Sequence, residues 1–245
     1  MEAELRNALA DDLDQLIRLH DRELDAETLA ALRATGFPDG LALCPADEAG
    51  VAARAQMAEA LAGIPDPVPG AMLDELAADY AAIYLNNAFG ASPYESVWLD
   101  DDHLACQQPM FELRDIYAAA GLKVADWRTR YDDHCVFQLQ YLRHCLVTGA
   151  VNGEDLANFI DDHIGYWFPD FAQRVAGHCG TPFYAALAGV THVWLRALRG
   201  LLDEIYDCPV PAHEAVKARI ERKLRLEKAE VAPIRFMPGV QGPSW

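Results

Sequence analysis

The chain has 245 residues, of which 52% are hydrophobic and 24% charged, so it is expected to fold around a core rather than remain disordered. Its formal charge of −18 disfavours binding to nucleic acid or anionic membranes and favours basic peptides or cations. The sequence contains no run of about 18 apolar residues, so no membrane helix is predicted. The acidic residues 1–5 do not resemble a signal peptide. Six cysteines without a Cys-x-x-Cys pair then predict reduced thiols in the cytoplasm.

Helical patterns account for most of the sequence, and no convincing strand pattern occurs. Apolar residues at helical spacing predict helices over about residues 5–19, 48–62, 71–87, 109–120, 131–148, 152–168, 182–206 and 212–229. The helix over 131–148 is apolar on nearly all sides and should be central, with Asp132 in its first turn. The pattern predicts an all-α bundle of about nine or ten helices.

Breaks between these helices have recognisable signals. Three prolines within 63–70 interrupt the chain, and Gly121 and Gly149 are typical residues after a helix end. The helix that Asn152 caps is expected to stop before Pro169. A capping-box-like pair, Thr129 with Asp132, precedes the central helix.

The predicted organisation has four parts. Residues 1–121 form an N-terminal helical subdomain, 122–130 a polar hinge, 131–210 a C-terminal helical subdomain, and 211–245 a basic helix with a tail. Six basic residues against two acidic ones over 217–228 give that helix a local charge of +4. It is interpreted either as a solvated helix on the acidic body or, with the partly apolar residues 230–245, as a regulatory tail that occupies a peptide groove.

The triplet Asp-Asp-His occurs three times, at 101–103, 132–134 and 161–163. Carboxylate and imidazole groups could ligate a metal, but adjacent residues on a helix diverge by about 100°, so one triplet cannot easily chelate with both groups. His163 is interpreted as a hydrogen-bonded core histidine or as a ligand. No phosphate-binding glycine loop, nucleophile elbow or His-Glu-x-x-His motif occurs, and no cofactor is expected.

The irregular segment 88–100 places Phe89, Tyr94 and Trp98 in a loop. One interpretation is that Trp98 and Leu99 plug the bundle. The other is that the loop forms the wall of a groove, because an aromatic surface near acids suits a peptide with arginine and apolar side chains.

The order of several short motifs resembles the TorD/DmsD/NarJ family of redox-enzyme maturation chaperones. The resemblance covers roughly residues 71–206 and rests on Tyr80, Tyr84, Ser96-Val97-Trp98-Leu99, Gly121, Asp133-His134, Leu139, His163, Trp167, Pro169, Phe171, Phe183-Tyr184 and Leu187. It implies an all-helical, cytoplasmic, non-enzymatic protein. It also implies binding to the twin-arginine leader or body of a molybdenum-cofactor oxidoreductase subunit during cofactor insertion, before export or assembly.

The resemblance implies a leader-binding region formed by Pro93, Ser96, Val97, Trp98, Leu99, Asp133 and His134. We add their neighbours Tyr94 and Asp132, an aromatic ring and a second acid, as further binding candidates. In the expected arrangement Asp133, with Asp132, faces the arginines, and the aromatic loop receives apolar side chains. His134 would orient Asp133 and titrate near neutral pH. The alternatives are a helical metal-dependent hydrolase and a general helical peptide-binding adaptor. A monomer and a dimer swapped at 122–130 both remain open.

Overall fold

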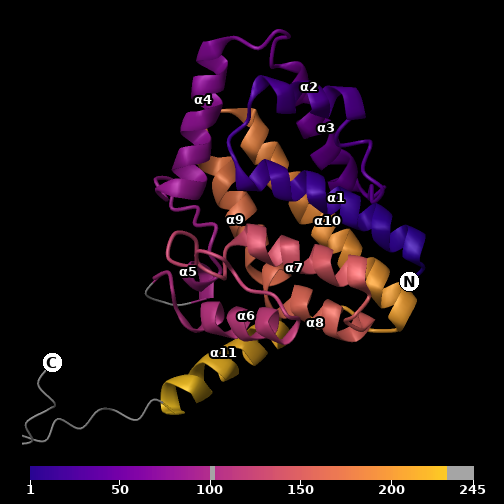
Figure 1. Cartoon of the computed structure of the whole chain (residues 1–245), viewed down its shortest axis with the longest axis vertical. Coiled ribbons are helices and arrows are strands. Elements are labelled where there is room, and N and C mark those ends of the chain that lie inside the picture. The colour runs from indigo at the N-terminus through magenta and orange to yellow at the C-terminus, as the bar shows by residue number, and fades with distance from the viewer. Residues whose placement is uncertain (100–102, 231–245) are drawn as a thin grey trace, which may run out of the picture. The chain divides into compact units, whose positions relative to one another are not determined.

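Residues 1–99 and 103–230 are described by the computed structural model, and their side chains up to residue 226 (Figure 1). The helices are α1 (Ala3–Asp21), α2 (Ala26–Thr35), α3 (Glu48–Ala62), α4 (Gly70–Tyr80), η1 (Ala81–Leu85), α5 (Ser96–Leu99), α6 (Gln108–Ala119), α7 (Cys135–Thr148), α8 (Gly153–Asp162), α9 (Ile164–His178), α10 (Pro182–Tyr206) and α11 (His213–Glu230). The described residues contain no strand, only one isolated antiparallel bridge between Tyr94 and His134. The predicted all-α class is confirmed.

Contacts divide the chain into two units, Met1–Pro211 and Ala212–Trp245. The first unit contains α1 to α10, and the second contains α11, the charged helix expected over 212–229. The predicted hinge at 122–130 lies inside the first unit and stays a prediction. Residues 231–245 lie outside the described residues, so the regulatory-tail interpretation is not tested.

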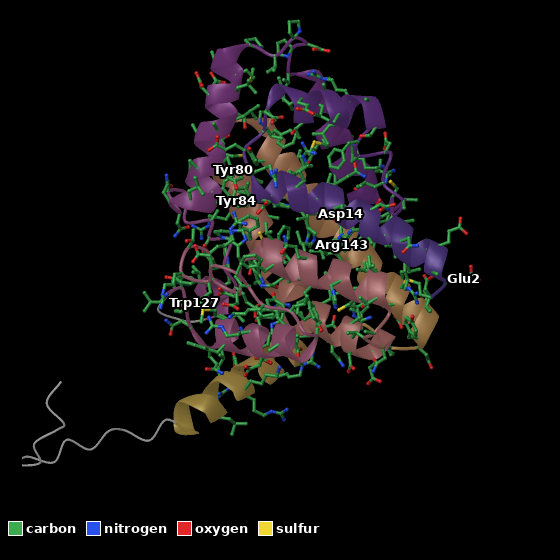
Figure 2. All side chains as sticks on the ribbon, in the orientation of Figure 1. Glu2, Asp14, Tyr80, Tyr84, Trp127 and Arg143 are labelled. Atoms are coloured by element: carbon green, nitrogen blue, oxygen red, sulfur yellow. The ribbon has the colours of Figure 1, made fainter. Side chains whose placement is uncertain are left out.

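Three helix pairings organise the first unit. α1 packs along α7, and α10 packs along α3 and α9 (Figure 1). In α1 the side chains of Leu9, Leu13 and Leu16 recur on one helical face and are fully buried. Arg143 of α7 and Asp14 of α1 point toward one another across their pairing (Figure 2), with Nη2 2.8 Å from Oδ2. The core therefore joins helices from both halves of the sequence.

Several helix ends are formed by capping residues that can be identified in the sequence. Asn152 caps α8 by accepting a hydrogen bond from the Asp155 N–H at 2.8 Å, as predicted. Gly121 and Gly149 adopt φ values of +75° and +61° after α6 and α7, which other residues adopt only with strain. α10 starts at Pro182, and the carboxylate of Asp79 accepts hydrogen bonds from the backbone N–H groups of Gly180 and Thr181 at 2.9 and 2.6 Å.

Three boundary predictions were wrong. The central helix begins at Cys135 rather than 131, because the His134 side chain is its N-cap. The chain breaks at His163, with φ of −123° and ψ of −110°, and α9 then continues through Pro169. The helix over 71–87 changes at Ala81 into the π-helical turn η1, in which the Asn86 N–H donates to the carbonyl of Ala81, five residues earlier.

None of the described helices is both long and apolar enough to cross a membrane. All six cysteines are free thiols; Cys135 and Cys145 are buried, and the other four are half-buried. The six thus form no disulfide with one another.

Candidate functional site

The segment 93–99 is tied to the start of α7 by backbone hydrogen bonds. The carbonyl of Pro93 accepts from the Cys135 N–H at 2.8 Å, and the Glu95 N–H donates to the carbonyl of Asp133 at 3.2 Å. The bridge between Tyr94 and His134 lies between these two bonds. The structure therefore brings together two groups of predicted residues that are more than thirty positions apart in the sequence.

Asp133 holds the beginning of α5. Its Oδ2 accepts a hydrogen bond from the Ser96 N–H at 2.9 Å, and its side chain is fully buried. Burial raises the pKa of this carboxyl, while the hydrogen bonds from Ser96 oppose the rise. Its second oxygen, Oδ1, has no hydrogen-bond partner among the described residues. The expected exposure of Asp133 toward a ligand is not seen, since the carboxylate lies beneath the segment.

A second buried acid, Glu95, lies in the same segment and was missed by the sequence analysis. Its Oε1 is hydrogen-bonded to His163 Nδ1 at 2.9 Å, and it is 1% exposed. Burial raises the pKa of Glu95, although His163 lowers it in part. His163 is thus a hydrogen-bonded core histidine, one of its two predicted interpretations. No local pattern marks Glu95, because its partner is 68 residues away.

The two acids act on a common neighbour, Tyr117 of α6. Burial raises the pKa of the Tyr117 hydroxyl well above its usual range, and the charges of Glu95 and Asp133 add to the rise. Neither the Tyr117 hydroxyl nor Glu95 Oε2 has a hydrogen-bond partner among the described residues. The region under the segment therefore contains unsatisfied acceptors and negative potential, a setting that favours a donor with positive charge.

His134 does not have the role that was predicted for it. Its Nδ1 accepts a hydrogen bond from the Val136 N–H at 3.1 Å, so the ring caps α7 instead of orienting Asp133. Burial lowers the pKa of His134 well below its usual range, and the charge of Arg130 lowers it further. The expectation that His134 titrates near neutral pH is wrong.

Asp132 is also engaged within the protein. Its Oδ2 is 2.8 Å from Arg114 Nη2, and the carboxylate is almost fully buried. The Arg114 guanidinium lies 4.9 Å from the ring centre of Trp127, a surface side chain that is 37% exposed (Figure 2). Asp132 is thus neither a first-turn acid of α7 nor free to face a ligand. The capping-box pairing with Thr129 is also wrong, because the Thr129 hydroxyl donates to Asp126.

The accessible part of the site is apolar. Tyr94, Val97, Trp98 and Leu99 are each half-buried, whereas Pro93 and Ser96 are buried. Trp98 donates from Nε1 to the carbonyl of Ser92 at 2.9 Å and stacks on Trp167 with ring centres 6.5 Å apart. Trp98 therefore packs on the core, in line with one of its two interpretations, and is half-buried. The interpretation of the loop as a groove wall stays a prediction.

The described residues of the three Asp-Asp-His triplets do not form a common site. Asp101 and Asp102 lie outside the described residues, and His103 is bonded to the carbonyl of Val97 at 2.9 Å. In the third triplet, Asp161 pairs with Arg199 at 2.8 Å. Among the described residues, no three His, Cys, Asp or Glu side chains are grouped as ligands for a metal ion. The observed arrangement thus offers the hydrolase alternative no ligand set within that part of the chain.

Comparison with known proteins places the site within a family match. The family model described as "Nitrate reductase delta subunit" matches residues 45–173, a range that includes 93–99 and 132–134. The chain is 31% identical over 145 residues to a chaperone protein TorD of Shewanella oneidensis, and 28% identical over 141 residues to one of Vibrio cholerae. These alignments cover 56% and 54% of this chain and 64% of each relative. The chain thus spans just under two thirds of the length of these relatives.

Proposed function

Because the chain belongs to the nitrate reductase delta subunit family, the TorD/DmsD/NarJ group of redox-enzyme maturation chaperones, we propose that it is a cytoplasmic chaperone without catalysis of its own. In this proposal it binds the twin-arginine leader, or the body, of a molybdenum-cofactor oxidoreductase subunit. It holds that subunit while the cofactor is inserted and releases it for export or assembly. The TorD name of the relatives supports the chaperone role.

The observation that carries the proposal is the half-exposed apolar surface over two buried acids. A twin-arginine leader combines guanidinium groups with an apolar run, so it needs both kinds of contact. Tyr94, Val97, Trp98 and Leu99 would contact the apolar run. Aromatic side chains of this kind also stack on guanidinium planes.

An arginine of the leader would reach Asp133 when the segment 93–99 lifts. The unpartnered Asp133 Oδ1 and Glu95 Oε2 are acceptors that a guanidinium fork could satisfy. α5 has only four residues, and so short a helix adds little stability of its own. Local opening of such segments costs far less than global unfolding. We therefore assign to Asp133 the role of the arginine acceptor and to Asp132 the positioning of Arg114.

Affinity should be moderate, because the chaperone must release its client. Micromolar binding corresponds to about −8 kcal/mol. The charge of −18 should speed association with a basic leader at low salt and matter less at high salt. Binding of a twin-arginine peptide that does not weaken with salt would contradict an electrostatic contribution.

A synthetic leader peptide tests the site. We expect Trp98→Ala and Asp133→Asn each to weaken binding about tenfold, as loss of an interface anchor or of a charge partner does. The control is Ile205→Ala, which truncates an exposed apolar side chain in the last turn of α10. Wild-type affinity in both site variants, measured by titration calorimetry, would exclude this region as the leader site.

The client is tested separately, by purifying the tagged chain from its native host. Recovery of a molybdenum oxidoreductase subunit supports the maturation role. Recovery of unrelated peptides or proteins would favour the general adaptor. A stoichiometric transition metal in the purified protein would reopen the hydrolase alternative.

A further inference from the structure

A groove outside the candidate site runs between α3, α4 and the beginning of α10. The volume of the groove is about 530 Å³. Its lining residues are Gln56, Glu59, Ala60, Gly63, Ile64, Met72, Glu75, Ala176, Gly180, Thr181, Pro182, Phe183, Ala185 and Ala186. Half of these residues are exposed, so the groove is open to solvent rather than an enclosed cavity. It includes none of the residues that we propose to bind the leader.

The groove results from the way α10 is held by two helices. α10 packs extensively along α3 and touches α4, and Figure 1 shows its first turns between them. The proline-containing connection 63–69 separates the end of α3 from the beginning of α4. Asp79 of α4 is hydrogen-bonded to Gly180 and Thr181, directly before α10. This anchor fixes the position of one wall relative to α10.

The floor of the groove is apolar and built largely from small residues. Ala60, Ile64 and Ala186 are buried there, and Met72 lines one wall half-buried. Small side chains let the backbone of a second helix approach closely, as in other helix packings. A peptide helix that binds in such a groove inserts roughly three or four apolar side chains at i, i+3, i+4 and i+7.

The charges on the groove are of one sign. Glu59 and Glu75 are the charged lining residues, both are exposed, and neither has an ion-pair partner in the described part of the chain. Arg33, which donates from Nη2 to the carbonyls of Ile64 and Pro65, pairs with Asp66 and not with either glutamate. A ligand with basic side chains would therefore meet two unneutralised carboxylates on a body of charge −18.

We propose that this groove is a second docking surface, which binds an apolar peptide helix flanked by arginine or lysine. The apolar face of the helix rests on Ala60, Ile64 and Ala186, and its basic side chains pair with Glu59 and Glu75. The partner is thus a segment of another protein, defined by this chemistry. The inference does not depend on the identity of the client or on the site at 93–99.

The test uses two synthetic peptide helices of about 14 residues, long enough for i, i+3, i+4 and i+7 anchors. Both have the same leucine face, and one carries arginine at its edges where the other carries glutamate. Fluorescence anisotropy with the full chain should show at least about tenfold tighter binding of the arginine peptide. Equal affinity of the two peptides would overturn the proposal.

A charge-matched pair of variants locates the effect. Glu59→Gln with Glu75→Gln changes the net charge by +1 +1, from −18 to −16, and Glu204→Lys gives the same −16. Glu204 is exposed near the far end of α10. The double variant should weaken binding of the arginine peptide about fivefold, in keeping with exposed ion pairs, and Glu204→Lys should not. An equal loss in both would show only a net-charge effect and overturn the proposal.

Filling the groove provides the second arm. Ala185→Trp places a large ring on a half-buried lining position and should weaken binding of the arginine peptide at least about tenfold; unchanged binding would overturn the proposal. If this variant does not fold, hydrogen exchange of the wild-type chain decides. Protection by the peptide at 56–64 and 182–186 supports the groove, and protection confined to other residues refutes it.

Two other occupants give different results. Deletion of residues 231–245 that raises peptide affinity would assign the groove to the chain's own tail. A dimer in light scattering that the arginine peptide dissociates would assign it to a second copy of the chain. Either result would overturn the assignment to another protein.

Discussion

Replacing Asp133 tests how the candidate site is held together. Its Oδ2 accepts the Ser96 N–H at 2.9 Å, and Ser96 is fully buried. Asp133→Ala leaves that donor without an acceptor, which costs about 1–3 kcal/mol. Removal of a buried carboxylate offsets part of this cost. We expect a net loss of roughly 1–2 kcal/mol, or about 2–8 °C in Tm for a chain of this size.

Asp133→Asn separates the hydrogen bond from the charge. The amide oxygen can still accept from Ser96, and the amide group resembles the protonated carboxyl in shape. The folded-state pKa of Asp133 is raised above its ordinary value of 3.8. The stability that the protonated acid contributes is therefore complete below 3.8 and is lost as the pH rises through the folded pKa. In acid, Asp133→Asn and the wild type should have the same free energy of unfolding. As the pH rises, the variant should become more stable than the wild type.

Urea unfolding followed by circular dichroism, between about pH 4.5 and about pH 8, measures both variants. The difference in unfolding free energy between Asp133→Asn and the wild type should increase with pH. A difference that decreases with pH would refute the reasoning, because it would mean that the fold stabilises the ionised carboxylate. Equal stability of Asp133→Ala and the wild type would refute the role of Asp133 as the acceptor for Ser96.

The same unfolding assay tests substitutions at four further sites. Gly153→Ala should cost about 1–3 kcal/mol, because the added methyl group would lie 2.2 Å from the tyrosine ring that ends α10; Gly177→Ala, with nothing within 4 Å, should instead gain up to about 1 kcal/mol. Arg199→Ala should cost about 3–5 kcal/mol, since this buried guanidinium pairs with Asp161 and donates to two backbone carbonyls. Burial lowers the pKa of His20 to about 3, so its contribution is complete above 6.5 and is lost as the pH falls toward 3. His20→Gln should therefore lose less stability between about pH 7 and about pH 5 than the wild type does.

A different outcome would contradict each of these stability predictions. An unchanged Gly153→Ala would mean that the tyrosine ring moves aside at little cost. A small effect of Arg199→Ala would mean that water replaces its three hydrogen bonds. Equal acid sensitivity of His20→Gln and the wild type would mean that other groups bind the protons.

Local signals predicted the helices well where the cap and the periodicity agree. Asn152, Gly121 and Gly149 mark helix ends in the sequence, and each does so in the structure. The prediction of a helix end before Pro169 was wrong. Proline disfavours a helix interior, yet Pro169 lies inside α9. Burial of neighbouring aromatic residues such as Phe168 outweighs the local preference. Propensity is a weak guide where packing is this extensive.

The candidate site was predictable only in part, because its contacts are between distant residues. The segment 93–99 and the pair Asp133-His134 could be named from the sequence, but their burial could not. The burial of Glu95 leaves no local signal, because its partner His163 is 68 residues away. The partner of the Asp132 side chain could not be predicted either, since Arg114 lies 18 positions earlier, in α6. Long-range partners of this kind leave no periodic signal.

The π-helical turn η1 affects the direction in which the following loop leaves the helix. The bond from Asn86 to Ala81 spans five residues instead of four, as if one residue had been inserted into a regular α-helix. Deleting one residue in Ala81–Leu85 would restore the regular spacing. The chain leaving the helix would then be rotated by about 100°, and segment 93–99 would start from a different direction. A single insertion upstream thus determines the direction in which the chain enters the candidate site.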